Sequence, residues 1–387
     1  MKPASGARRS TRGQAVAIIA ALLVQVGCVS PASNLFYDHF ERSYDPVDLE
    51  EELIPPPPNH HRIAGVPWIS HDEVYCQSTI LQMVAAYHGI EEPIEYFNWL
   101  MGHTYSAFHK GSFYTFVPMY DPEMGLMTAS PYLGLERTLY ATNDRDLAIR
   151  AARSFLSRGY PVRVPLDYSI LTGDRFFFPH AELLVGYEGD EFLYHEPGFS
   201  DRNTYGEEPL RIAADTLMDA VLSHTGEYGY SRRYYFCVFQ PAEPRRDPEW
   251  IRHRNGDMLI GGRVFMRIVQ GEMAYHNLAA EIDAGRVPEW AWREVLYLWM
   301  DAGRYTREDN ARFIRSRFSH DRDLLDVADL LGESAARYAR ICAIIDHRSP
   351  PSTDEQREIS STLVAIGEIE RRAGELLQGD EQRLSAR

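Results

Sequence analysis

The sequence feature that most constrains the fold is segment 66–90, which reads VPWISHDEVYCQSTILQMVAAYHGI. After Cys76 its apolar residues recur at steps of three and four, the period of a helix with one buried face; they are Ile80, Leu81, Met83, Val84 and Tyr87. A cysteine in the first turn of a helix lies among unpaired backbone N–H groups, at the positive end of the helix dipole, and both favour a thiolate. This segment therefore offers an activated nucleophile. The alternative is a structural cysteine, because Cys is among the most buried residue types.

The composition limits the classes of protein to which the chain can belong. Its 387 residues are enough for two domains with sizeable cores, and 44% hydrophobic with 25% charged residues is typical of globular proteins. The net charge of −16 argues against a nucleic-acid partner, whose phosphates require clustered Lys and Arg. We expect no cofactor and no metal, since the C-terminal part shows neither a metal-spaced cluster nor a phosphate-binding loop.

Residues 1–28 are typical of an export signal rather than of a folded domain. Arginines within the first twelve positions precede an uncharged run, 15–26, which has the length of a signal-peptide core and is short for a membrane span. Gly27 and Cys28 follow directly, as at a bacterial lipoprotein cleavage site, where the cysteine is lipidated. The pattern predicts an exported protein held at the cell envelope by a lipid on Cys28. Ordinary secretion after cleavage near 30–32 is the alternative.

The cysteines left after this lipidation do not suggest disulfides. Cys76, Cys237 and Cys342 are odd in number and unrelated in spacing. An unpaired cysteine in an exported protein needs a chemical reason, which strengthens the interpretation of Cys76 as a reactive thiol. Cys237 lies in a strand pattern and Cys342 on the apolar face of a predicted helix, so we expect both in the core.

Composition and periodicity divide the rest of the chain into three parts. Segment 29–61 is acidic and contains four consecutive prolines, which predicts a linker with a polyproline II spacer. Segment 62–243 mixes helix and strand signals, whereas segment 244–387 shows helical periodicity alone, after a charged boundary near 245–257. We therefore expect an α+β domain followed by an all-α helical bundle.

In the α+β part, the Cys76 helix precedes a second helix and a long aromatic segment, 101–140. This segment could form a structured roof over a cleft, and the alternative is an aromatic core under a long loop. The further predicted elements are helix 146–158, strands 160–167, 181–187 and 191–195, helix 212–223 and strand 234–239. Helical periodicity in the bundle covers 258–284, 288–301, 309–318, 324–346 and 354–378, with Thr306 and Ser352 as start signals and with Trp290, Trp292, Trp299 and Phe313 in the core.

Two further residues complete a candidate catalytic group with Cys76. His180 stands at the entry to an apolar strand, and Glu196 falls at the end of the next strand. Because a hairpin places such positions within reach of each other, Glu196 can orient the imidazole while His180 pairs with the thiolate. The alternatives are a core histidine and a turn glutamate.

The order Cys, His, carboxylate resembles papain-like enzymes, and segments 66–89, 160–167, 180–187 and 196–197 resemble the bacteriocin-processing (double-glycine leader) peptidase-like family. Its Val-Pro lead-in, cysteine at a helix start and Tyr-x-Gly helix end are present here. This resemblance implies a papain-like cysteine-protease fold over about 66–241, with a peptide or amide substrate. Cys76-Gln-Ser-Thr and the aromatic segment are also similar to the N-terminal domain of the butirosin biosynthesis protein H family, which implies acyl transfer to an amine.

The sequence departs from the peptidase family at three positions. His71 stands where the family has its oxyanion glutamine, Gln77 replaces a glycine, and Glu196 replaces an aspartate. The resemblance assigns oxyanion binding to His71 together with the Cys76 amide. Three hypotheses remain: an exported thiol hydrolase, an acyltransferase, and a catalytically inactive peptide-binding lipoprotein whose helical bundle binds a protein partner.

Overall fold

The computed structural model describes residues 43–71, 75–173, 177–198, 208–265, 268–345 and 350–379. The predicted export signal, the lipidation site Cys28 and the first part of the predicted linker lie outside the described residues. Among the helices that are described, none has both the length and the apolar character needed to cross a membrane.

The first half of the chain is built on a mixed eight-stranded sheet. Its strands are β1 Val47–Asp48, β2 His60–Arg62, β5 Leu135–Thr142, β6 Val162–Asp167, β7 Pro179–Glu188, β8 Glu191–His195, β9 Leu210–Ala213 and β10 Tyr234–Pro241. The strand order is β1-β5-β10-β6-β7-β8-β9, with β2 paired to β7, and every pairing is antiparallel except that of β1 with β5. The predicted hairpin of β7 and β8 lies inside this sheet.

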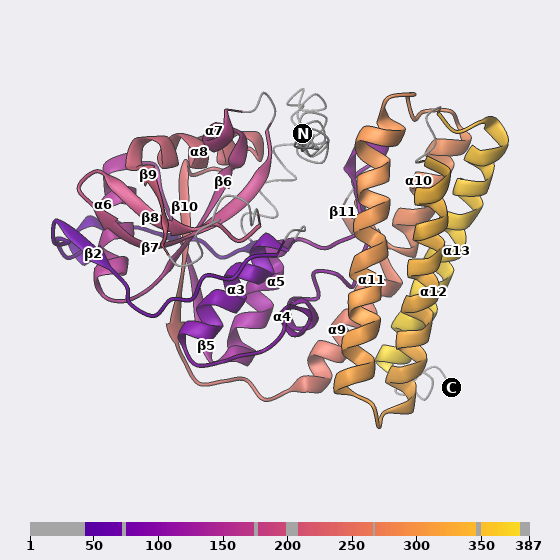
Figure 1. Cartoon of the computed structure of the whole chain (residues 1–387), viewed down its shortest axis with the longest axis horizontal. Coiled ribbons are helices and arrows are strands. Elements are labelled where there is room, and N and C mark those ends of the chain that lie inside the picture. Colours follow the sequence, from indigo (N-terminus) through magenta and orange to yellow (C-terminus); the bar gives the residue numbers. More distant parts are fainter. Residues whose placement is uncertain are drawn as a thin grey trace, which may run out of the picture.

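Helices cover both faces of the sheet, as Figure 1 shows. They are α3 Cys76–Tyr87, α4 Ile94–Met101 and α5 Pro122–Ala129 on one face, and α6 Arg145–Ser157, α7 Tyr168–Thr172 and α8 Ala214–Glu227 on the other. Alternate residues of β10 therefore pack into different cores. Cys237 packs with α3 and α4, whereas Phe236 and Val238 pack with α6 and α8. The predicted α+β, papain-like fold, with the cysteine helix packed on an antiparallel sheet, is confirmed for this half.

The C-terminal half is a group of helices in which the three longest lie side by side (Figure 1). Their bounds are α9 Pro248–Ile260, α10 Glu272–Asp283, α11 Tyr297–Arg317, α12 Arg322–Ile345 and α13 Thr353–Gln378, with a π-helical turn at Trp292–Leu296. Ser352 begins α13 with a reciprocal capping box to Glu355, as its sequence signal predicts. The predicted helical region after the α+β half is thereby confirmed.

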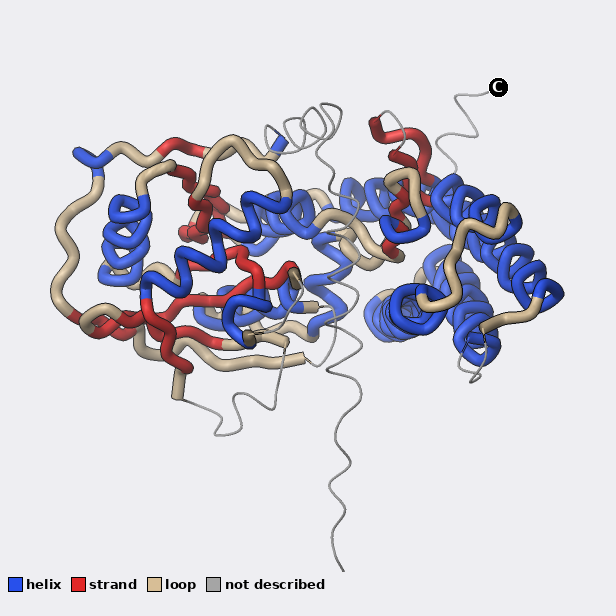
Figure 2. The backbone as a smooth tube through the Cα atoms, turned by 90° about the horizontal axis from the view of Figure 1, so that it is seen from above, coloured by secondary structure: helices blue, strands red, loops and turns tan. Residues whose placement is uncertain are grey.

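A small second sheet joins the two halves, and its presence corrects the prediction of one helix over 258–284. Its strands are β11 Gly261–Phe265, β12 Ile268–Gly271, β3 Phe108–His109 and β4 Phe116–Val117, in the order β11-β12-β3-β4. Gly261 and Gly271 have φ values of 72° and 61°, a conformation that interrupts a helix. The helix prediction follows the apolar period of this segment and does not take the two glycines into account. Figure 2 shows these strands against the helices of the C-terminal half. Because β12 pairs with β3, the aromatic segment is part of the interface between the halves.

Other elements differ from the sequence predictions in detail. Helix α11 is continuous through the predicted break at 302–308, and Thr306 is not a cap, because it is buried and its hydroxyl donates to the Ala302 carbonyl. The predicted linker contributes β1 and most of β2 to the sheet, and α5 and most of β5 lie in the predicted aromatic segment. Trp292 and Phe313 are buried as expected, whereas Trp290 is 38% exposed. Short 3-10 turns lie at Glu51–Leu53, Phe113–Thr115 and Ser130–Leu133.

Buried polar contacts fix α11 to the aromatic segment. The Arg307 guanidinium, which is fully buried, donates to the carbonyl oxygens of Ser106 and Pro118, at 2.7 Å each, and pairs with Glu370 at 2.8 Å. A buried charge is tolerated where its hydrogen bonds are complete, so this group sets one position of α11 against the α+β half.

Candidate active site

Cys76 is the first residue of α3 and is the accessible cysteine of the described part. It is half-buried, whereas Cys237 and Cys342 lie in the cores, as the sequence predicts. The residue before it, Tyr75, makes no side-chain capping bond to the first turn. Tyr75 therefore leaves the backbone N–H groups around the sulfur to act on a negative charge there.

His180 is the second residue of β7 and is only 3% exposed. Its ring packs edge-on against Tyr168, at 4.8 Å between centroids, and lies nearly parallel to Phe178, at 6.2 Å. These two aromatic rings restrict the imidazole to one orientation. Its Nε2 lies 2.7 Å from Oε1 of Glu196, so this nitrogen donates its hydrogen to the carboxylate.

Glu196 follows β8 and is fully buried. Its Oε1 also accepts the backbone N–H of Gly198 at 3.0 Å, in a turn where a Cβ on Gly198 would lie 3.1 Å from Cε1 of His180. Burial opposes the carboxylate, but the charge of His180 and the hydrogen bonds from His180 and Gly198 outweigh it and lower the pKa of Glu196 to about 2. This carboxylate is therefore charged throughout the physiological pH range.

The thiol and the imidazole also interact. Burial lowers the pKa of His180, but the charges of Glu196 and Cys76 and side-chain hydrogen bonds with both raise it well above its ordinary value. His180 thus interacts with Cys76 as well as with Glu196, and both interactions favour its imidazolium form. The structure brings together the three residues that the sequence selected. Such a group can hold a thiolate and deliver a proton to a leaving group.

Glu182 belongs to the same buried group and was not anticipated from the sequence. It lies two residues after His180 on β7, is 1% exposed, and its Oε1 is 4.0 Å from Nε2 of His180. A glutamate in the middle of an otherwise apolar strand was the signal that could have identified it.

His71 and Gln77, the two family departures near Cys76, have partners of their own. The His71 ring Nε2 lies 3.0 Å from Oε1 of Gln82, six residues along α3 from Cys76, and its backbone N–H donates to the Pro197 carbonyl. Gln77 is buried and accepts a hydrogen bond from Arg163. The structure thus ties the His71 backbone to the Glu196 turn and its ring to the middle of α3. The oxyanion role of His71 and of the Cys76 amide stays a prediction.

The C-terminal helices contact the residue next to the nucleophile. The Tyr75 hydroxyl donates to Oδ2 of Asp309 at 3.0 Å, and its ring packs edge-on against Tyr305, with centroids 5.9 Å apart. Both partners lie on α11. The helical half therefore supports the start of α3.

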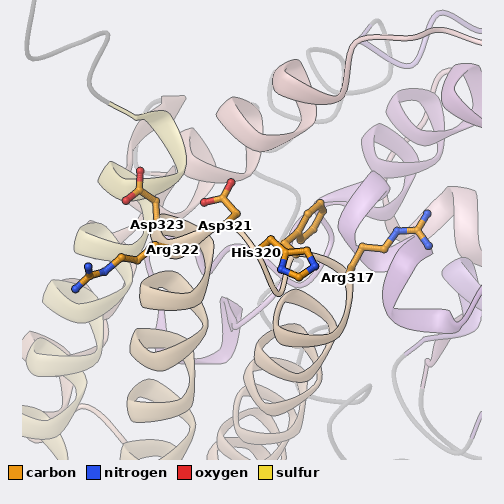
Figure 3. Close-up of a pocket in the computed structure, with 6 residues that line it drawn as sticks. Arg317, His320, Asp321, Arg322 and Asp323 are labelled. Atoms are coloured by element: carbon orange, nitrogen blue, oxygen red, sulfur yellow. The ribbon is translucent and has the colours of Figure 1, made fainter.

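A wide hollow lies elsewhere, at the turn between α11 and α12, where Figure 3 shows polar and charged side chains. Its lining residues are Arg317, Phe318, His320, Asp321, Arg322 and Asp323. None of these is a member of the Cys76 group, so this hollow is separate from the candidate active site.

Comparison with known proteins finds a similarity for part of the chain. Residues 62–213 match the model of the Peptidase_C39 like family, and the match includes Cys76, His180 and Glu196. No curated protein matches the chain. The matched segment is therefore similar to papain-like cysteine peptidases of this family, and the helices from α9 onward lie beyond the match.

Proposed function

We propose that this protein is an exported papain-like thiol hydrolase that cleaves a peptide or other amide bond with Cys76, His180 and Glu196. The observation that carries the proposal is the buried bond between Nε2 of His180 and Glu196, made by an imidazole that also interacts with the Cys76 sulfur. The family match over residues 62–213 supports the same class of reaction.

In the first half of the reaction the Cys76 thiolate attacks the substrate carbonyl carbon. A carbon–sulfur bond forms, and the carbonyl oxygen takes the negative charge, which the Cys76 backbone N–H stabilises. The His180 imidazolium then gives its proton to the leaving amine, the carbon–nitrogen bond breaks, and a thioester remains on Cys76.

In the second half, neutral His180 takes a proton from water as the water oxygen attacks the thioester. The carbon–sulfur bond breaks, the acid leaves, and the thiolate–imidazolium pair is restored. Glu196 keeps the ring in one orientation and stabilises its positive charge at each stage. An amine in place of water would give acyl transfer by the same steps.

The cellular context is part of the proposal. The basic residues and apolar run of 1–26 would direct export, and a lipid on Cys28 would hold the protein at the membrane. The contacts of α11 with Tyr75 support a role of the helical half in holding the active site, and binding of a protein partner by this half is part of the proposal.

The test is to trap the acyl intermediate. The wild-type chain and the Cys76→Ala variant are incubated with p-nitrophenyl esters of N-acetylated dipeptides, quenched in acid and mapped by peptide mass spectrometry, with Cys342→Ala as the matched control. We expect acylation of the Cys76 peptide in wild type and in the control. Product analysis with added glycinamide separates hydrolysis from transfer. Acylation that is no faster in wild type than in Cys76→Ala would favour the inactive peptide-binding protein.

A further inference from the structure

Glu182 faces Glu196 across the β7–β8 hairpin. Leu184 pairs with Tyr194 and Leu183 with His195, so the next position of the same register sets Glu182 directly opposite Glu196. Directly opposed residues in antiparallel strands have Cβ atoms about 5 Å apart, and this pair lies at the end of the strand that carries His180.

Both carboxyl groups of this pair are completely buried. Glu182 is 1% exposed and Glu196 is fully buried. Among the described residues, no hydrogen-bond donor reaches either oxygen of Glu182 or Oε2 of Glu196. Ionised carboxylates can only accept, and burying two of them face to face without a donor is strongly unfavourable. One proton between them removes this conflict, because a carboxylic acid can donate to a carboxylate.

We propose that Glu182 is a positioning residue that stays protonated and donates its hydroxyl hydrogen to Oε2 of Glu196. Glu196 is then held at both oxygens, with Oε1 directed at His180 and at the Gly198 amide. The inference rests on the proposed function, since it assigns Glu182 to the support of the Cys76–His180–Glu196 group.

The surroundings decide which of the two carboxyls holds the proton. The charged or titratable groups that act on Glu182 are Glu196, His180 and Cys76. Burial raises the pKa of Glu182 well above its ordinary value, and the negative charge of Glu196 adds to this. Glu196 has the direct bond to the imidazolium, which Glu182 lacks, so Glu196 is the ionised member.

A bound metal ion is a weaker explanation of the same cluster. Ligand atoms of His180, Glu182 and Glu196 lie within 4.8 Å of one another, which is close enough to hold a cation. A metal would require the Nε2 lone pair, and that nitrogen instead donates to Glu196 at 2.7 Å. A proton satisfies the same oxygens and leaves this bond intact.

Two substitutions separate the roles that Glu182 can have. Glu182→Gln keeps the size and a neutral donor, whereas Glu182→Leu keeps the volume and removes the donor. The readout is the rate of iodoacetamide alkylation at Cys76 between pH 5 and 9, resolved by peptide mapping, with Glu188→Gln on the same strand as an exposed control. We expect Glu182→Gln and the control to stay within about threefold of wild type, and Glu182→Leu to react ~10-fold or more slowly at pH 6.

An infrared measurement keeps the test independent of whether Glu182→Leu folds. Folded wild-type protein at neutral pH should show a protonated carboxyl band that Glu182→Gln lacks. Absence of that band overturns the inference, as does a Glu182→Gln variant that is as slow as Glu182→Leu, or a Glu182→Leu variant as fast as wild type. Equimolar Zn²⁺ binding to wild type that both variants lose would replace the proton by a metal site. If wild-type Cys76 itself reacts no faster than a small-molecule thiol, the proposed function fails first.

Discussion

Replacing Glu196 by glutamine tests how much of the thiolate–imidazolium pair depends on one carboxylate. The pKa of Glu196 is lowered from 4.5 to about 2. Burial alone would raise this pKa, and the charge of His180 is the main cause that lowers it. That shift corresponds to about 3 kcal/mol of preference for the ionised carboxylate, and the full burial of both groups means that solvent does not screen it. Glutamine keeps the shape and an acceptor for the Gly198 amide but removes the charge.

The imidazolium loses a similar stabilisation, so we expect the rate of Cys76 alkylation at pH 6 to fall ~100-fold in Glu196→Gln. The assay is the second-order rate with iodoacetamide, followed at the Cys76 peptide across the pH range. Glu191→Gln is the matched control, because Glu191 is a solvent-accessible carboxylate on the same hairpin. A rate for Glu196→Gln within about twofold of wild type would refute the argument that Glu196 stabilises the charged imidazole.

Three further predictions concern stability. Burial lowers the pKa of His224 to about 4 from its ordinary value of 6.5, so between these values the unfolded chain binds a proton that the folded chain does not. The contribution of His224 to the free energy of unfolding therefore falls by about 2 kcal/mol from pH 7 to pH 5, and His224→Phe should remove this part of the pH dependence in urea titrations. Tyr75→Phe removes the bond to Asp309 and should speed amide exchange in the first turn of α3 ~10-fold, measured by mass spectrometry; unchanged exchange contradicts a support role for α11. Arg307→Met leaves Glu370 buried without its cationic partner and should lower the free energy of unfolding by about 3–5 kcal/mol in urea titrations. The double variant Arg307→Met/Glu370→Leu should recover part of this loss, because it also removes the buried carboxylate.

The local patterns of the sequence predict the elements that carry the candidate site. A three-and-four period after Cys76, and two apolar strands separated by a tight turn, predict the helix and the hairpin that carry Cys76, His180 and Glu196. The contact between His180 and Glu196 follows from the hairpin, whereas the approach of Cys76 to His180 is expected only from the resemblance to the peptidase family. The β7–β8 register also places Glu182 opposite Glu196. Because Glu182 lies two residues after His180 on the same strand, strand alternation alone could have predicted that both point to the same face of the sheet.

Contacts between distant segments could not be read in this way. The pairing of β12 with β3 joins residues more than a hundred positions apart, and the ring of His71 takes a partner on α3 that no spacing rule selects. The continuity of α11 through Thr306 depends on burial against the aromatic segment, which overrides the capping tendency of threonine. Each of these outcomes is decided by tertiary packing rather than by the residues nearby.

The most direct test of the central claim is the pH dependence of Cys76 alkylation in wild type and in His180→Gln. If an imidazolium holds the Cys76 sulfur as a thiolate, wild type should react with iodoacetamide at pH 6 ~10-fold or more faster than free cysteine, and His180→Gln should lose this excess. A wild-type rate equal to that of free cysteine, unchanged in His180→Gln, would contradict the account.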